Sequence, residues 1–470
     1  MNSTSAAVTR DTDAIHPDIW KITCVAVIGA FMCHLDATIA NVSLSSLAKE
    51  LHSNLTVIQW VTSGYLLALA LVLPINGWLI DRIGGRALYF LALAGFTITS
   101  ALCGLAWSTE SLIAFRVLQG VSGGLLAPMA QITMARAAGK HMTSVLSVAA
   151  LPVVSAPLLG PIIAGVILQY ASWRWLFLIN LPVGALAILL TFLFLPDDRE
   201  ENKPRILDVK GLCLLSPGLV LFLYGAEHLR EIGGLVSLAS AVLLLTAFLR
   251  SSKEKGDEAL IDLRLFDIKA FRAAVVTQFL ANGVMFSGQM LIPFFLSRAW
   301  DRAPSSVGLL MAPSGIGMMC LFPFIGKIVK TFGVRNVSTS GAIISLLGTA
   351  SLGALVSQPP NYVLLAIALF MRGVGSSLVG IPTVSAAYSS VKREDLPMAT
   401  TALNIIMRIG GPTLTTACAT FLGWRLSLAT NHVEQLAGFT AAFGLLCALQ
   451  VFLLVSASRF PRNPDETSSK

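Results

Sequence analysis

The segment VIGAFMCHLDATIANVSLSSL, residues 27–47, is an apolar stretch that contains a single carboxylate, Asp36. A helix that spans a membrane needs about 20 predominantly apolar residues, and this segment meets that length. An ionisable side chain at bilayer depth is costly, so it normally faces a bundle interior or a watery cavity and handles ions, protons or substrates. The segment therefore predicts a membrane helix with a functional acid at Asp36.

The composition places the whole chain among all-α polytopic membrane proteins. Hydrophobic residues make up 55% of the chain and charged residues 12%, and the mean hydropathy is +0.76, which excludes a water-soluble domain. The seventh and eighth expected spans are weakened by Gly211 and Pro217, so twelve helices are the alternative to fourteen. The fourteen expected spans lie at residues 21–43, 57–77, 87–107, 111–135, 142–168, 174–195, 208–226, 232–249, 272–297, 305–328, 337–357, 361–386, 397–422 and 435–457.

The basic residues indicate the orientation of these helices. Lys and Arg accumulate in the short cytoplasmic loops of membrane proteins, and here most of them fall in the loops on the side of the amino terminus. We therefore expect both termini in the cytoplasm and interpret the net charge of +8 as topology, not as a nucleic-acid partner. The first helix should serve as the insertion signal, since no cleavable signal peptide is evident. The basic residues expected outside are Lys49, Arg174, Arg230, Arg298, Arg302 and Arg425.

Two polar stretches, residues 197–210 and 250–269, divide the chain into two halves and an inserted helix pair. FRVLQGVSGGLLAP in the fourth span resembles ALFMRGVGSSLVGIP in the second half, and GWLIDRIGGR from Gly77 has a degenerate echo from Gly326. Repeated halves that enclose a midplane site are typical of secondary transporters. We expect a cytoplasmic tail at 1–20, six-helix bundles at 21–197 and 270–458, a linker with two extra helices at 198–269, and a second tail at 459–470.

The loop GWLIDRIGGR, residues 77–86, combines glycines with charges. Gly77 allows two helices to approach closely, Asp81 can cap or pair at the end of a neighbouring helix, and Gly84 permits a tight turn. Arg82 and Arg86 add positive charge on the cytoplasmic side. The loop is interpreted either as a basic anchoring turn or as a gate whose charge network breaks when the cytoplasmic side opens.

Arg116 is a second charge at helical depth. It either snorkels to the outer surface or pairs with an acid, and Asp36 is the natural candidate because no other carboxylate is expected well inside a helix. The segment SAPLLGPIIAG, residues 155–165, predicts a smooth packing face with Gly160 and Gly165, kinked at Pro161.

Other polar residues at helical depth are candidates for a central cavity, although amides also join helices to one another. Two of the candidates are arginines, and in a cavity they would favour anionic or zwitterionic cargo over lipophilic cations. His34 lies about 200° around the helix from Asp36, so we expect it to pack or bond between helices rather than relay protons. The cavity candidates are Gln59, Tyr65, Gln131, Gln278, Asn282, Gln289, Arg372, Asn404 and Arg408.

The chain resembles the fourteen-helix drug:proton antiporter family of the major facilitator superfamily over nearly its whole length. The resemblance implies proton-coupled export by alternating access, with Asp36 as the embedded acid and Arg116 as the helix-four arginine. It also implies that Asp81 and Arg82 belong to the cytoplasmic gate and that Gly160 with Pro161 belongs to the antiporter motif. The resemblance is carried by LDATIANVSL (35–44), QWVTSGYLLALALVLPINGWLIDRIGGR (59–86), RVLQGVSGG (116–124), LGPIIAG (159–165), WRWLFLINLPVG (173–184) and LDVKGLCLL (207–215).

Three residues depart from that family's pattern. Ala87 stands where a second basic residue often follows Arg86, and Ala156 and Ala164 stand where the packing motif usually has glycine. These changes weaken the motif and leave the direction of coupling open.

The leading hypothesis is a proton-driven exporter of small organic molecules, in particular antimicrobial or toxic compounds, in the plasma membrane (the inner membrane of a Gram-negative bacterium). The alternatives are an exporter of one physiological metabolite or siderophore and, against the embedded charges, a transport-silent sensor. No pattern for an enzyme, a cofactor, a metal or ATP is found. The expected partners are substrate, protons and lipid; we expect a monomer and leave a periplasmic adaptor open.

Overall fold

The structure, a computed structural model, describes residues 15–196, 206–229, 231–302 and 304–461. Helices and short connections make up this part of the chain, and it contains no strand. The expected tails, at 1–14 and 462–470, and part of the first linker, at 197–205, lie outside the described residues. Thirteen helices in the described part are long and apolar enough to cross a membrane, which agrees with the expected all-α membrane fold.

The helices follow one another along the chain with short connections. The first half holds α1 (Pro17–Val42), α2 (Leu44–Glu50), α3 (Leu55–Ile58), α4 (Trp60–Val72), η1 (Leu73–Ile75), α5 (Asn76–Ile83), α6 (Gly85–Gly104), α7 (Thr109–Ala138), η2 (Gly139–His141), α8 (Met142–Tyr170), α9 (Trp175–Leu178) and α10 (Asn180–Phe194). Then come α11 (Val209–Glu227), α12 (Ile232–Lys255), η4 (Gly256–Glu258) and η5 (Leu263–Asp267). The second half holds α13 (Lys269–Arg298), α14 (Pro304–Leu355), α15 (Tyr362–Ser389), η6 (Arg393–Asp395), α16 (Leu396–Ser427) and α17 (His432–Ser458).

The backbone repeats between the two halves at the glycine loop. Gly84, between α5 and α6, has φ 85° and ψ 152°, and Gly333 within α14 has φ 77° and ψ 156°. These angles interrupt a helix and favour glycine. A straight helix of the 52 residues of α14 would be about 78 Å long, more than twice the bilayer core. Gly333 thus divides α14 into two segments, which is compatible with fourteen spans; that number stays a prediction.

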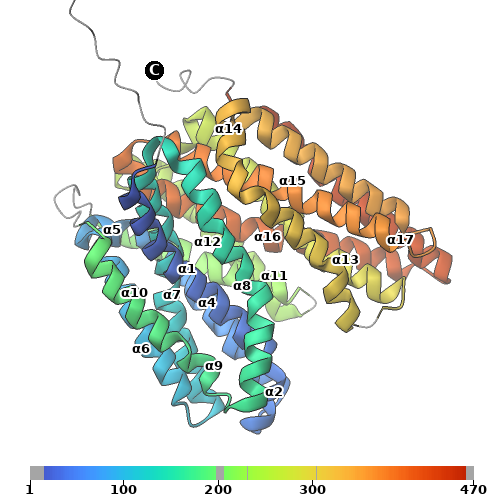
Figure 1. Ribbon diagram of the computed structural model, residues 1–470, viewed down its shortest axis with the longest axis horizontal. Helices are drawn as coiled ribbons and strands as arrows, with labels where there is room; N and C mark the ends of the chain where they lie inside the picture. Colours follow the sequence, from blue (N-terminus) through green and yellow to red (C-terminus); the bar gives the residue numbers. More distant parts are fainter. Residues whose placement is uncertain (1–14, 197–205, 230, 303, 462–470) are drawn as a thin grey trace, which may run out of the picture.

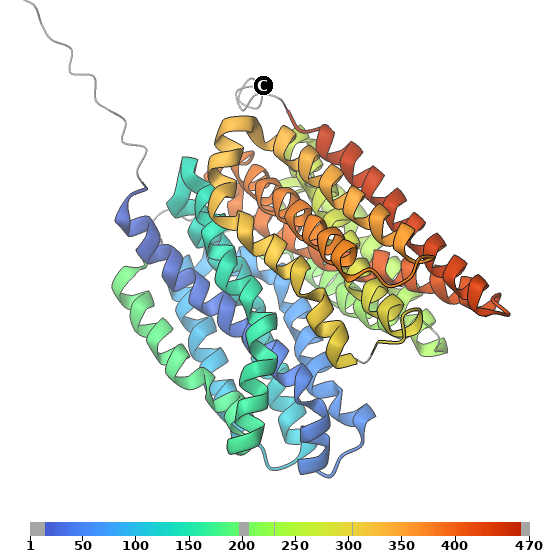
Figure 2. The same cartoon turned by 45° about the vertical axis from the view of Figure 1, so that its right-hand side comes forward.

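The two halves meet at one end of the molecule and diverge at the other (Figures 1 and 2). We call the end where α1 begins and α17 ends the closed end. There, one apolar core joins both halves, with Met134 and Met142 from the first and Tyr388 and Leu396 from the second. At the opposite, open end, each half has its own core. The two halves are therefore packed together at the closed end and lie apart at the open end.

The two inserted helices are present where the sequence places them. α11 and α12 pack against each other, and α11 also contacts α4 of the first half and α16 of the second. Trp60 of the first half stacks on Tyr224 at 6.3 Å between ring centroids, and Thr416 Oγ1 donates to the Ala226 carbonyl at 3.3 Å. The inserted pair therefore lies across the junction of the two halves, and both of its helices are long and apolar enough to cross a membrane.

Candidate functional site

Asp36 and Arg116 form an ion pair inside the first bundle. Nη1 of Arg116, on α7, lies 2.5 Å from Oδ2 of Asp36, on α1, and their side chains are 0% and 1% exposed. Nε of Arg116 donates to the Val61 carbonyl of α4 at 3.0 Å. Arg116 therefore lies in the bundle interior rather than at the outer surface, and its partner is the acid that the sequence suggested.

Three further polar side chains complete a buried network around Asp36. Asn180, at the start of α10, donates from Nδ2 to Asp36 Oδ1 at 2.8 Å and to Ser100 Oγ at 3.0 Å. Gln119 accepts from Arg116 Nη1 at 2.7 Å and donates to Asp36 Oδ1 at 3.3 Å. Both carboxylate oxygens of Asp36 thus accept hydrogen bonds, as a buried charge requires.

Sequence reasoning did not assign these network residues. Asn180 stands in WRWLFLINLPVG, and Gln119 aligns with Arg372 in the internal repeat, so each had a signal in the sequence. Ser100 had none, because a serine in an apolar helix commonly bonds to its own backbone.

Tyr65 belongs to this network and not to the cavity lining. Its ring centroid lies 4.2 Å from the Arg116 guanidinium carbon, and the side chain is buried. α7 approaches α4 closely enough for this stacking because Gly120 and Gly124 face the backbone of α4, at the carbonyls of Tyr65 and Leu69. A side chain at either glycine would push the two helices apart.

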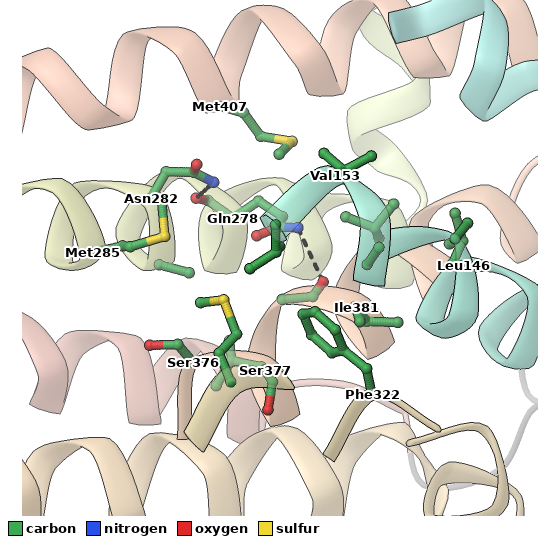
Figure 3. A pocket seen from close by; sticks show the side chains of 18 of the residues that line it. Leu146, Val153, Gln278, Asn282, Met285, Phe322, Ser376, Ser377, Ile381 and Met407 are labelled. Atoms are coloured by element: carbon green, nitrogen blue, oxygen red, sulfur yellow. Dashed lines mark hydrogen bonds between the residues drawn. The ribbon is translucent and has the colours of Figure 1, made fainter. Parts of the chain in front are cut away.

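A cavity of about 410 Å³ lies between the two halves. Its lining is largely apolar and comes from α1, α7 and α8 on one side and α13 to α17 on the other. Figure 3 shows Met285 and Met407 near Asn282 and Gln278, with Phe322 and Val153 nearby. The volume lies within the range of cavities that bind drug-sized molecules.

Gln278 and Asn282 line this cavity, as expected. Nε2 of Gln278 donates to the Gly380 carbonyl at 3.1 Å, and Nδ2 of Asn282 donates to the Gln278 carbonyl at 3.0 Å (Figure 3). Gln289 is exposed two turns beyond Asn282 on the same helix, outside the lining. These three amides mark one polar stripe along α13.

For other candidates the expectation of a place in the cavity lining is wrong. Gln59 is exposed at the beginning of α4, at the end of a helix and away from the cavity. Arg372 is buried inside the second bundle, where Nη1 donates to Thr349 Oγ1 at 3.1 Å. Asn404 donates to Gln131 Oε1 at 2.8 Å across the two halves, and of these two only Gln131 lines the cavity.

His34 was expected to pack or to form a hydrogen bond between helices, and the structure places it in the cavity lining instead. Its side chain is exposed and lines the cavity, whereas Asp36, two residues later, is buried on the other side of α1. The helical angle between them was correctly anticipated, but which face met the cavity was not. α1 therefore separates the ion pair from the cavity.

Glycines at the closed end allow the two halves to pack closely against each other. Gly77 on α5 faces Pro397 and Thr401 at the start of α16, and Gly326 on α14 faces Ser144 at the start of α8. The two contacts are equivalent by the internal repeat, and both close the same end.

The three charged residues of the glycine loop lie in different environments. Asp81 is half-buried and lines a second cavity, and Arg82 is exposed. Arg86 Nη2 donates to the Phe192 carbonyl at 2.8 Å, near the end of α10 in its own half. Arg86 therefore anchors its own bundle, and a gating role of Asp81 and Arg82 stays a prediction.

The second cavity holds a buried acid that joins the inserted helices to the closed end. Asp208 accepts from Lys255 Nζ at 2.5 Å and from the amides of Gly211 at 2.8 Å and Leu260 at 3.1 Å. Burial raises the pKa of Asp208, but these hydrogen bonds and the Lys255 charge outweigh burial, so its pKa lies below the ordinary value.

The packing segment of α8 meets the expectation in part. Gly160 contacts Thr38 of α1, so α8 approaches α1 two residues from Asp36. Gly165 has nothing near the position of a Cβ atom, so the expectation of close packing there is wrong. α8 continues as one helix through Pro161, which is exposed.

Comparison with known proteins assigns the family. The sequence pattern of the Major Facilitator Superfamily matches residues 26–411 and 274–470. The chain is 31% identical to a "Multidrug resistance protein B homolog" of Mycobacterium tuberculosis strain H37Rv, over 88% of this chain and 77% of that protein. It is 32% identical to the Salmonella typhi protein MdtD, over 95% of each chain.

Solved structures share the fold. The human organic anion transporter MFSD10 superposes with a TM-score of 0.67 at 15% identity, covering 94% of this chain and 100% of that one. The proton:xylose symporter XylE, bound to 6-bromo-6-deoxy-D-glucose, gives 0.63 at 13% identity, with coverage of 92% and 94%. At these identities the likeness concerns the fold alone. The chain belongs to the major facilitator superfamily, a family of multi-pass membrane transporters.

Proposed function

We propose that the protein exports small organic molecules in exchange for protons, with Asp36 as the proton-binding group. The observation that carries this proposal is the sealed pair of Asp36 and Arg116 on one face of α1, with a drug-sized cavity on the other face. Ionisable residues embedded in a membrane protein commonly pair with one another and mark proton or substrate pathways, and the substrate sites of secondary transporters lie between their repeats. The mycobacterial relative's name supports a multidrug cargo.

The proposed cycle depends on charge balance around Asp36. Protonation removes one negative charge, so Arg116 loses its ion-pair partner and keeps Gln119 and the Val61 carbonyl as neutral acceptors. The rearrangement moves α1, whose other face carries His34 in the cavity. Gly160 transmits the shift to α8 through its contact with Thr38. Proton binding and cargo binding thereby favour different states, which links the two gradients.

The orientation follows from the positive-inside rule. With both termini in the cytoplasm, the closed end faces the cytoplasm and the open end faces outside. The structure then corresponds to the state that releases cargo outward and takes up protons from outside. In a bacterium the protein resides in the inner membrane; a monomer, with or without a periplasmic adaptor, suffices for this cycle.

Transport into liposomes that contain the purified protein tests the proposal. Purified protein in liposomes receives either a pH gradient or, with potassium and valinomycin, a membrane potential of equal energy and no pH difference. We expect accumulation of cargo in response to the pH gradient, abolished by nigericin, which collapses the gradient. Accumulation that is indifferent to the pH gradient would remove proton exchange from the proposal.

The second candidate is an exporter of one physiological metabolite with the same fold. The observation that favours it is the presence of Arg372 and Arg408 in the second half, because fixed charges select particular cargo. Competition among chemically unrelated compounds for transport separates the two, since a metabolite exporter should recognise one compound class only.

A further inference from the structure

The cavity between the halves has no negative charge of its own. None of the described residues that line it is Asp or Glu. Asp36 is on the far face of α1 and is already paired with Arg116. A cationic cargo would therefore find no carboxylate in this conformation, whereas cationic groups of the protein lie close by.

Arg408 is the cationic group best placed to meet cargo. It lies one turn beyond Asn404 on α16, and Asn404 reaches across to Gln131 of the first half, so this face of α16 is directed between the halves. Its neighbour Met407 lines the cavity. The Arg408 charge acts on His34 and Tyr65 of the opposite half. Arg408 itself is not among the residues that line the cavity, contrary to the expectation from the sequence. Its position one turn from Asn404 places it beside the cavity, on the face of α16 that meets the first half.

Arg408 also lacks a fixed partner. It is half-buried, and within the described part of the chain it makes no hydrogen bond or ion pair. A guanidinium that has lost much of its water without gaining an acceptor is costly. His34, which lines the cavity opposite, likewise has no ring hydrogen bond to a described residue. His34 in the cavity lining and Arg408 beside it are therefore two donors that have no hydrogen-bond partner among the described residues.

Arg372 adds a second positive charge near the cavity, inside the second bundle. It lies one turn from Ser376, which lines the cavity, and its acceptor is the neutral hydroxyl of Thr349. No carboxylate within the described residues pairs with it. The electrostatic field of the second half is therefore positive next to the cavity, which favours anions.

From these observations we propose that Arg408 and His34 bind the carboxylate or sulfonate group of an organic anion whose apolar body occupies the cavity. This inference rests on the proposed export function and adds the chemical class of the cargo. The apolar body would lie among methionines such as Met285 and Met407, whose flexible side chains adapt to ligands of different shape. A bidentate contact from Arg408 would supply the anchor.

Binding of matched aromatic probes to the protein in nanodiscs, without any gradient, tests this site. The probes are 2-naphthoate, its neutral analogue 2-naphthamide and the cation 2-naphthylmethylammonium. We expect wild-type protein to bind 2-naphthoate about 10-fold or more tightly than the other two. Arg408→Gln should remove this preference, Arg408→Lys should retain most of it, and His34→Gln should weaken 2-naphthoate binding about 3-fold.

Arg425→Gln, in the last turn of α16, is the matched control and should bind all three probes as wild type does. Size-exclusion profiles identify a variant that has failed to fold, and Arg408→Lys then carries the test. The inference is overturned if wild type binds the neutral or cationic probe as tightly as 2-naphthoate, if it binds none of them, or if folded Arg408→Gln keeps the preference. If wild type keeps the preference for 2-naphthoate in nanodiscs while its transport in liposomes does not respond to a pH gradient, proton exchange is contradicted and this site stands.

Discussion

The two halves of the molecule share a backbone and differ in the charges they bury. Gly120 of α7 faces the carbonyl of Tyr65, and Gly373 of α15 faces the carbonyl of Ser314, so the same helix contact recurs in each half. The polar residue before each glycine has diverged. Gln119 donates a hydrogen bond to Asp36 and accepts one from Arg116, whereas the matching Arg372 donates to a threonine. We propose from this difference that the first half holds the proton site and that the second half sets the sign of the cargo.

The largest expected effect comes from replacing the buried arginine of each half. Arg116→Met strands Asp36 as an unpaired buried charge, which should cost about 3–5 kcal/mol of stability. Arg372→Met removes a buried cation that has no carboxylate among the described residues, so the change should stay within about 1 kcal/mol or stabilise. Thermal unfolding in detergent at neutral pH measures both variants. Equal losses in the two would show that the halves do not differ in this way.

A smaller effect is expected from the amide that holds Asp36 in place. Asn180→Ala removes the hydrogen bonds to Asp36 and Ser100, which should cost about 1–3 kcal/mol and shift the pH dependence of transport. Gln289→Ala is the control, because Gln289 is an exposed amide outside the cavity lining. If Asn180→Ala kept the wild-type pH profile, Asn180 would not position the proton site.

The smallest effect concerns the acid beside the closed end. Because the pKa of Asp208 in the folded protein lies below its ordinary value of 3.8, its stabilising contribution is present above about pH 4 and is lost as the pH falls through the lowered value. Asp208→Asn should therefore lower stability by about 1 kcal/mol at pH 7, with less difference from wild type in acid. Unfolding at several pH values measures this, with Asp267→Asn, at an exposed acid, as the control. A pH-independent difference between wild type and Asp208→Asn would contradict the prediction.

The sequence predicts the architecture well because the signals for a membrane helix lie within each segment of the chain. The length of the apolar stretches predicts the helices, the glycine loop predicts the repeat, and the polar stretches predict the inserted pair. The repeat at Gly326 is degenerate in sequence, and yet Gly84 and Gly333 adopt nearly the same backbone angles. Both halves therefore have a glycine at the position with this conformation, even though the neighbouring residues differ.

The candidate site was harder to predict, because it depends on which face of a helix meets which neighbour. The pairing of Asp36 with Arg116 followed from the scarcity of embedded charges. The placement of His34 in the cavity, and of Tyr65 and Arg372 outside it, depends on rotations of α1, α4 and α15 that hydrophobicity on all sides of a helix leaves open. Asn180 and Ser100 come into contact with Asp36 only through packing of distant helices.

The most direct test of the account is proton movement in liposomes that contain Asp36→Asn protein. Asparagine keeps the shape of the side chain and a hydrogen-bonding oxygen for Arg116 but cannot bind a transported proton. Asp18→Asn, an exposed acid at the start of the same helix, is the matched control. The account predicts that cargo drives a pH change with wild type and Asp18→Asn and none with Asp36→Asn. A wild-type rate of cargo-driven proton movement in Asp36→Asn would contradict it.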